Sequence, residues 1–333
     1  MGGDVATRGA GESPPEQRLE PTAKGLAAQA KAREYARRSM SPATLRAYRS
    51  DWQHFTAWCT EAGLEPIPAE PSTVGAYLAS LGPTHAPTTI RRRLAAIGQM
   101  HRYNGFSWET GGLEIRATLK GVLAEHGEPV RQAAAIRLTD LRKLVDTCDD
   151  TPVGRRDRAL LLLGFAGAFR RSELVALEVT DVIPTPFGLR VRIRRSKTDQ
   201  ERQGAEIGIP RGKNPATCPV RAVEAWRATL KHRAGPLFRR ISKAGTIGRD
   251  ALVPDSVRFL LLGRAHLAGI TVPGGDRLTA HGLRAGFITE AYDKGVRDQD
   301  IMDHTRHRDH KTMRGYVRRA KLLSESPAGK VGL

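Results

Sequence analysis

A single stretch of strict alternation limits what this chain can fold into. Apolar residues alternate with arginines over residues 189–194, and Ile207 and Ile209 repeat the pattern after a polar stretch. Alternation of this kind is typical of β-strands, so the two runs predict a β-hairpin with one basic face. The other periodic segments repeat at intervals of three and four, which indicates helices. We therefore predict a mainly α-helical chain with a small β-hairpin or sheet, arranged as α+β in its second domain.

Residues 39–125 predict a compact helical domain. Ser41 and Pro42 suit the N-cap and first position of a helix whose apolar side chains recur as far as Gly63. Further helices are predicted after Ser72, after Pro87 and around residues 113–124. The size and helix count of this unit are typical of a small helical bundle.

The remaining boundaries follow from composition. Residues 1–38 are rich in Gly, Pro, Ala, Glu and Arg without a sustained apolar period, and they predict a flexible or partly helical arm. Residues 126–137 contain Pro129 and predict an interdomain linker. A second domain over residues 138–323 would follow, with one helix capped by Thr139 and another that starts after Thr279, and residues 324–333 would form a tail.

The charge of the chain indicates a polyanionic partner. Lys and Arg number 54 against 35 Asp and Glu, a formal net charge of +19. Charge alone does not separate nucleic acid from an anionic membrane. The longest apolar run, residues 159–169, is far shorter than the roughly 20 residues of a spanning helix, and no signal peptide precedes it. We expect a cytoplasmic, nucleoid-associated protein that binds no membrane.

The third helix of the first domain carries the candidate DNA-binding residues. Thr88, Thr89, Arg91 and Arg92 fall on its first turns, where side chains and free amides can meet phosphates or enter a major groove. A solvated basic face explains the same pattern equally well.

Four separated segments of the second domain offer groups that a phosphodiester transfer needs. In the first, Arg170 precedes Glu173 by three residues, so that the carboxylate can hold the guanidinium. In the second, Lys197 lies at the predicted hairpin tip, where it can donate a proton. The third and fourth segments hold the pair His281 and Arg284, at a helix start, and the pair His307 and Tyr316, nine residues apart.

These segments resemble the active-site boxes of the tyrosine recombinases, or phage integrases. The matching strings are Gly-Ala-Phe-Arg-Arg-Ser-Glu-Leu, Ser-Lys-Thr-Asp, His-Gly-Leu-Arg, and a His followed nine residues later by Tyr. One box is a weak match, whereas four in order are a strong one. The resemblance extends over residues 40–323 and implies a core-binding domain over residues 39–125 and a catalytic domain over residues 138–323.

The resemblance also implies a role for each matching residue. The catalytic set would be Arg170, Lys197, His281, Arg284, His307 and Tyr316, with Glu173 in support. The Tyr316 phenol would attack a phosphodiester, leaving a 3′-phosphotyrosyl link and a free 5′-hydroxyl. Lys197 is the candidate general acid, and His281 the candidate for proton handling at the tyrosine.

By the same resemblance, the partner is double-stranded DNA with a specific recombination site, bound by a homotetramer. Arginine and histidine donors can stabilise the charge that develops on the nonbridging phosphate oxygens without a metal ion, so the resemblance implies no cofactor, metal or ATP. One residue departs from the family pattern, because Arg306 stands where a Gly usually precedes the last-box histidine. A left-handed backbone at that position would strain an arginine, whereas a glycine that serves only close packing would leave the backbone ordinary.

Three alternatives remain at this stage. His304, His307 and His310 are spaced three apart and could gather around a metal ion, although no carboxylate or Cys cluster accompanies them. The three cysteines lie far apart in sequence and show no paired spacing for zinc or disulfides, so they predict buried, reduced thiols. The charge and helices also suit a non-catalytic, sequence-specific DNA-binding protein. A type IB topoisomerase uses the same residue types, but the separate helical domain and the Ser-Lys-Thr-Asp segment favour a recombinase.

Overall fold

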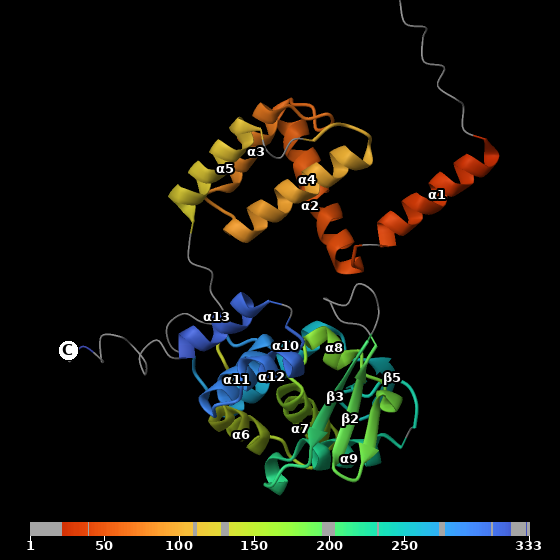
Figure 1. The fold of residues 1–333 in the computed structure, drawn as a ribbon, viewed down its shortest axis with the longest axis vertical. Coiled ribbons are helices and arrows are strands. Elements are labelled where there is room, and N and C mark those ends of the chain that lie inside the picture. Colours follow the sequence, from red (N-terminus) through yellow and green to blue (C-terminus); the bar gives the residue numbers. More distant parts are fainter. Residues whose placement is uncertain are drawn as a thin grey trace, which may run out of the picture. The chain divides into compact units, whose positions relative to one another are not determined.

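The computed structural model describes residues 22–38, 40–108, 112–127, 133–194, 204–231, 233–272, 277–307, 309–320 and 331. The chain divides into two compact units, Met1–Pro129 and Val130–Leu333 (Figure 1). No helix of the described residues is long and apolar enough to cross a membrane.

Among its described residues, the first unit contains helices joined by turns and loops, and no strand. Its helices are α1 (Ala23–Arg38), α2 (Pro42–Ala62), α3 (Pro71–Leu81), α4 (Pro87–Tyr103) and α5 (Leu113–His126). The Ser41 side chain accepts a hydrogen bond from the Thr44 amide at 3.1 Å, and Gly63 ends α2 with φ 68°. Both ends of this helix are therefore where the sequence predicts them. Part of the predicted N-terminal arm forms α1.

The core of the first unit joins α2, α3, α4 and α5. Phe55, Tyr77, Leu78 and Ile97 are fully buried in it. Buried Asp51 of α2 binds Arg92 of α4 through two hydrogen bonds of 2.9 Å each. This ion pair lies at the edge of the apolar core and fixes how α4 sits on α2.

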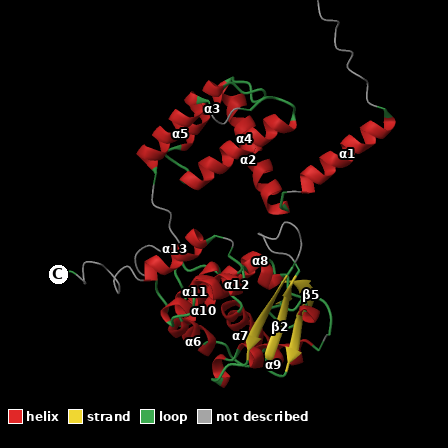
Figure 2. Ribbon diagram, in the orientation of Figure 1, coloured by secondary structure: helices red, strands yellow, loops and turns green. Residues whose placement is uncertain are grey.

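The second unit combines helices with two small antiparallel sheets (Figure 2). Its helices are α6 (Leu138–Asp146), α7 (Pro152–Ala166), α8 (Arg171–Val175), α9 (Pro219–Leu230), α10 (Pro254–Leu267), α11 (His281–Asp293), α12 (Asp298–Thr305) and α13 (His310–Ala320). Its strands are β1 (Val182–Thr185), β2 (Gly188–Ile193), β3 (Ala205–Pro210), β4 (Arg239–Ile241) and β5 (Ile247–Ala251). The predicted α+β class is confirmed.

The predicted hairpin is the pair β2 and β3. Val191 lies opposite Ile207, and Leu189 opposite Ile209, so that the apolar residues of both strands face the core. The predicted basic face is partly neutralised, because Arg192 lies 3.4 Å from Glu206 and Arg194 lies 2.7 Å from Asp181. The hairpin tip, residues 195–203, lies outside the described residues, and so does the predicted general acid Lys197.

The predicted cap at Thr139 is wrong, whereas a helix does start after Thr279 as predicted. Helix α6 begins one residue before Thr139, and its first amide, that of Leu138, donates to the Glu290 side chain from α11 at 3.1 Å. Thr279 lies before α11, and its buried hydroxyl makes no hydrogen bond to the described residues. Glu290, distant in sequence, binds the first amide of α6, and no local pattern reveals this contact. Strands β1, β4 and β5 and helix α12 are also absent from the prediction, since they are short.

The end of the predicted linker belongs to the second unit. Ile136 is buried in its core, and its amide donates to the Gly282 carbonyl of α11 at 3.0 Å. A Cβ at Gly286 would lie 1.8 Å from the Ile136 carbonyl oxygen. The glycines of α11 therefore allow this segment to cross the helix at close range, which fixes the helix that carries His281 and Arg284.

Candidate active site

Arg170 and Glu173 form the first part of the site, at the start of α8. The Glu173 carboxylate accepts from the Arg170 backbone amide at 3.0 Å and from its Nη1 at 2.6 Å. Arg170 is the N-cap of the helix, so one carboxylate fixes both its backbone and its guanidinium. The ion pair expected between Arg170 and Glu173 is present in the structure.

Arg284 is held in the interior of the unit. Its side chain is fully buried, and Nη1 donates to the Ala168 carbonyl at 2.7 Å. Ala168 has φ 45°, a left-handed conformation in the turn between α7 and α8. The turn thus directs a backbone carbonyl at the guanidinium of Arg284.

His307 follows α12 and faces Arg284. Its Nε2 lies 3.2 Å from Arg284 Nη2, and its Nδ1 lies 2.7 Å from the Thr305 hydroxyl. That hydroxyl donates its only hydrogen to the Ile301 carbonyl at 2.6 Å, so it accepts from His307 Nδ1. The contact selects the tautomer with the proton on Nδ1 and leaves the Nε2 lone pair toward Arg284.

Tyr316 reaches the site from α13. Its hydroxyl contacts His281 Nε2, and its ring centroid lies 6.0 Å from that of His307. The ring packs against the small cluster formed by Ile288, Ile301, Met302 and Met313. This cluster joins α11, α12 and α13 and so positions the phenol beside the two histidines.

The cations of the site and its burial keep both histidines neutral. Burial lowers the pKa of His307 to about 3, and Arg284 and Arg170 contribute to the shift. Desolvation also lowers the pKa of His281, with contributions from Arg284 and Arg170, although His281 is an exposed residue. Burial, together with the neighbouring charges of Arg170 and Arg306, lowers the pKa of Arg284 to about 9. The site therefore holds concentrated positive charge that an anion would relieve.

Arg306 has a left-handed backbone, the conformation in which glycine would be free of strain. It has φ 59° and ψ 44° and ends α12, while the His307 amide donates to the Met302 carbonyl at 3.0 Å. A left-handed conformation costs a non-glycine residue on the order of 1 kcal/mol. The Arg306 side chain turns inward, where Nη2 donates to Glu173 at 3.0 Å and offsets that cost.

The predicted DNA-binding residues lie in the first unit, on the first turns of α4. Thr88 and Arg91 are exposed, and Thr89 is half-buried. Arg92 is also exposed in part, but its guanidinium is engaged by Asp51. The structure thus gives Arg92 a structural contact and leaves DNA binding by this helix a prediction.

The three histidines considered for a metal do not share a site. His304 Nε2 lies 2.8 Å from the Ala166 carbonyl, and its ring stacks on Phe287. His307 faces Arg284 instead, and His310 begins α13. Among the described residues, no three His, Cys, Asp or Glu side chains come together as metal ligands would. All three cysteines are buried.

Two residues of the site went unrecognised in the sequence. Thr305 precedes His307 by two residues, and only the spacing from the histidine hints at its role. Ala168 contributes a backbone carbonyl, for which residue type carries no signal.

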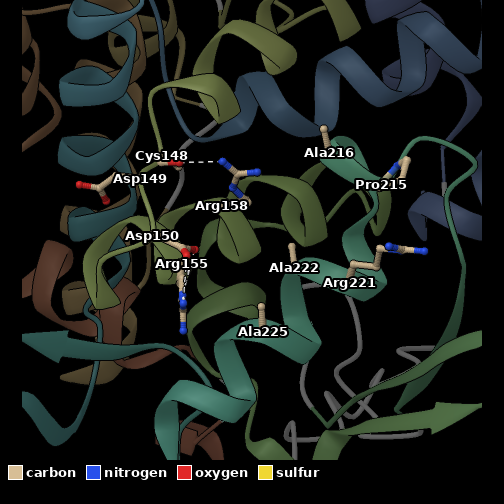
Figure 3. A pocket seen from close by; sticks show the side chains of 10 residues that line it. All are labelled: Cys148, Asp149, Asp150, Arg155, Arg158, Pro215, Ala216, Arg221, Ala222 and Ala225. Carbon is tan, nitrogen blue, oxygen red and sulfur yellow. Dashed lines mark hydrogen bonds and ion pairs between the residues drawn. The ribbon is translucent and has the colours of Figure 1, made fainter.

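A separate hollow of about 320 Å³ lies between α7 and α9 (Figure 3). There Arg158 donates to the Cys148 carbonyl and Arg155 pairs with Asp150, so these two arginines make local contacts within the unit.

Comparison with known proteins assigns the chain to a family. Residues 135–322 match the model of the phage integrase family, and residues 35–104 match the N-terminal SAM-like domain of phage integrases. The first match alone spans more than half of the chain. The chain belongs to the phage integrase family. Its fold and its function as a site-specific tyrosine recombinase, both predicted from the sequence, are confirmed at this level.

Relatives of this phage integrase family member cover nearly its whole length. An integrase/recombinase XerD homolog of Selenomonas ruminantium is 33% identical over 306 residues, 90% of this chain and 89% of the relative. Tyrosine recombinase XerD of Listeria monocytogenes is 25% identical over 292 residues, 86% of this chain and 91% of the relative. A lambda integrase dimer bound to a COC′ core site has the same fold, with a TM-score of 0.59 at 14% identity over 91% of this chain and 82% of that chain.

Proposed function

We propose that Tyr316 is the nucleophile of this recombinase and that Arg170, Arg284 and His307 bind the scissile phosphate. The observation that carries the proposal is the contact of the Tyr316 hydroxyl with His281 beside Arg284 and His307. A phenol, a neutral imidazole and fixed guanidinium groups are the parts that metal-free transfer of a phosphodiester requires.

In the proposed step, the Tyr316 oxygen forms a bond to phosphorus as the bond to the 5′-oxygen breaks. The phenol proton passes to Nε2 of His281, and the departing 5′-oxygen takes a proton from Lys197. The product is a 3′-phosphotyrosyl link with a free 5′-hydroxyl. Attack by another 5′-hydroxyl reverses the step, so neither ATP nor a metal enters it.

The arginines and His307 stabilise the charge that develops on the nonbridging oxygens. His307 is neutral without a ligand, and its low pKa comes from burial and from Arg284 and Arg170. A phosphate beside these cations raises that pKa, because opposite charge favours the imidazolium form. His307 then donates from Nε2 to the phosphate.

A nicked-duplex library of random sequence tests this chemistry and finds the target site together. The protein should form a denaturation-resistant adduct with a subset of duplexes, and sequencing of the captured DNA identifies the site. Tyr316→Phe should bind the same DNA without forming the adduct, because it lacks the nucleophilic oxygen and keeps the ring. Adduct formation that persists in Tyr316→Phe, or that stops in EDTA, would overturn the proposal. Sequence-specific binding by the unaltered protein without any adduct would favour the non-catalytic alternative.

We further propose that the recombinase acts as a homotetramer on two synapsed duplexes, at the nucleoid in the cytoplasm. A lambda integrase tetramer bound to a Holliday junction supports this assembly, with a TM-score of 0.57 over 87% of this chain and 76% of that chain. Sedimentation of the protein with the captured site should give four copies per two duplexes. A complex that stays at one or two copies would contradict the tetramer. A relaxed plasmid without strand exchange would indicate the topoisomerase alternative.

A further inference from the structure

Arg306 combines two features that oppose each other. Its backbone is left-handed, a conformation for which glycine is the usual solution, and its charged side chain is only 11% exposed. Buried guanidinium groups require partners, because an unpaired charge in the interior is costly. The partners of Arg306 therefore indicate what the residue does.

The Arg306 guanidinium connects three backbone positions and one carboxylate. Nη2 donates to Glu173 Oε2 at 3.0 Å and to the Ala168 carbonyl at 3.3 Å. Nη1 donates to the carbonyls of His304 at 3.0 Å and of Gly167 at 3.3 Å. Its planar head also lies over the Phe169 ring, 5.4 Å from the centroid. These contacts join the end of α12 to the turn before α8.

Both acceptors of Nη2 also hold an arginine of the proposed active site. Glu173 accepts from Arg170, and the Ala168 carbonyl accepts from Arg284 at 2.7 Å. Arg306 is thus one hydrogen-bonded step from each of these arginines, and its own backbone leads directly into His307.

We propose that Arg306 is a positioning residue that holds Arg170, Arg284 and His307 in one arrangement for phosphate binding. The inference rests on the proposed roles of those three residues. Glycine at this position would relieve the backbone but would leave Glu173 and Ala168 without their shared donor. Lysine would keep the charge but could not reach the acceptors as a planar fork.

Arg306→Gly, Arg306→Lys and a matched control, Lys231→Gly, test the proposal. Lys231 is exposed, ends α9 with φ 55° and belongs to no part of the site. Its replacement relieves a left-handed backbone without touching the network. Each full-length variant is compared with the unaltered protein in single-turnover adduct formation on the captured nicked duplex, in affinity for that duplex, and in thermal melting.

Arg306→Gly should slow adduct formation by about 100-fold, the effect of small misplacement of reacting groups, while DNA affinity and folding are retained. The rate of adduct formation by Arg306→Lys should lie between the rates of Arg306→Gly and of the unaltered protein. The rate of Lys231→Gly should equal that of the unaltered protein. Guanidinium ion, added below denaturing concentration, should partly restore the rate of adduct formation in Arg306→Gly and should leave the rate of Lys231→Gly unchanged. Unaltered rates in Arg306→Gly, or a loss explained by unfolding without guanidinium rescue, would overturn the proposal.

A second measurement needs no DNA and separates this proposal from the proposed function. In the free protein, the imidazole signals of His307, assigned by their loss in His307→Gln, should shift in Arg306→Gly and should titrate at higher pH. The same signals should stay unchanged in Lys231→Gly. Signals of His307 that are identical in Arg306→Gly and the unaltered protein would overturn the positioning role. Absence of any adduct from the unaltered protein would instead count against the proposed function alone.

Discussion

The hydroxyl of Tyr316 contacts Nε2 of His281, and their ring centroids lie 5.7 Å apart. His281 is the first residue of α11, whereas Tyr316 lies in α13, and the buried side chains Ile288 and Met313 hold these helices together. The contact allows a neutral imidazole to receive the phenol proton. The protonation state of His281 should therefore control attack by the tyrosine.

Adduct formation should lose rate on the acid side of a pH profile, and the loss should begin below the ordinary histidine pKa. Removal from solvent and the charges of Arg284 and Arg170 lower the pKa of His281 from 6.5. The neutral base thus persists below pH 6.5, and the rate falls only as pH drops through the lowered pKa. Rates of adduct formation at DNA concentrations well below saturation, which report the pKa of the free protein, measure this acid limb.

His281→Gln should slow adduct formation by about 100-fold or more and remove that acid limb, because the general base is lost. His266→Ala, at an exposed histidine of α10, serves as the control and should retain both rate and limb. An unchanged limb in His281→Gln would assign the proton transfer to another group.

Thr305→Val should lower both stability and activity. The change keeps the side-chain shape but removes the hydroxyl that binds His307 Nδ1 and the Ile301 carbonyl. Loss of these hydrogen bonds should cost about 1–3 kcal/mol in the free energy of unfolding and about tenfold in adduct formation. Thr305→Ser keeps the hydroxyl and should stay near the unaltered protein in urea unfolding and in rate. Equal behaviour of the two variants would contradict the role of the hydroxyl.

Gly286→Ala should destabilise the second unit by about 3 kcal/mol or more, because its Cβ would overlap the Ile136 backbone. Gly263→Ala, within α10, is the matched control, since no described atom outside that helix's own backbone lies within 4 Å of its added Cβ. Alanine favours a helix over glycine by roughly 1 kcal/mol, so this control should be stabilised or unchanged. Urea unfolding measures both, and equal effects would rule out the close crossing of residue 136 over α11.

Arg91→Ala should alter DNA binding, whereas Arg92→Ala should alter stability. Arg91 is exposed on α4, and if it binds a phosphate its loss should reduce the salt dependence of DNA binding by about one unit of slope without affecting stability. Arg92→Ala should cost about 1–2 kcal/mol of stability, since it removes two hydrogen bonds from buried Asp51. Binding titrations at several salt concentrations and thermal melts check both. A salt slope unchanged in Arg91→Ala would favour the solvated basic face.

Much of the fold is readable from the sequence because it depends on local periodicity. The apolar repeat between Ser41 and Gly63 fixes a helix and both of its ends, and the alternation at residues 189–194 fixes a strand. Strand β1 and helix α12 are too short for such a repeat to stand out. The cap of α6 comes from Glu290, more than a hundred residues away, and no local pattern encodes it.

By itself, the sequence determined the helical class, the hairpin and the order of the residues that carry the family's chemistry, since these depend on residue type and spacing. The tertiary structure alone decided which partners those residues have. The carbonyl of Ala168 meets Arg284 because the turn before α8 is left-handed there, and Tyr316 meets His281 because an apolar cluster packs α13 on α11. From the sequence, Arg306 is only a departure from the family pattern. In the structure its side chain links Glu173 to the end of α12. Such contacts depend on the path of the backbone through space, which residue spacing along the chain does not specify.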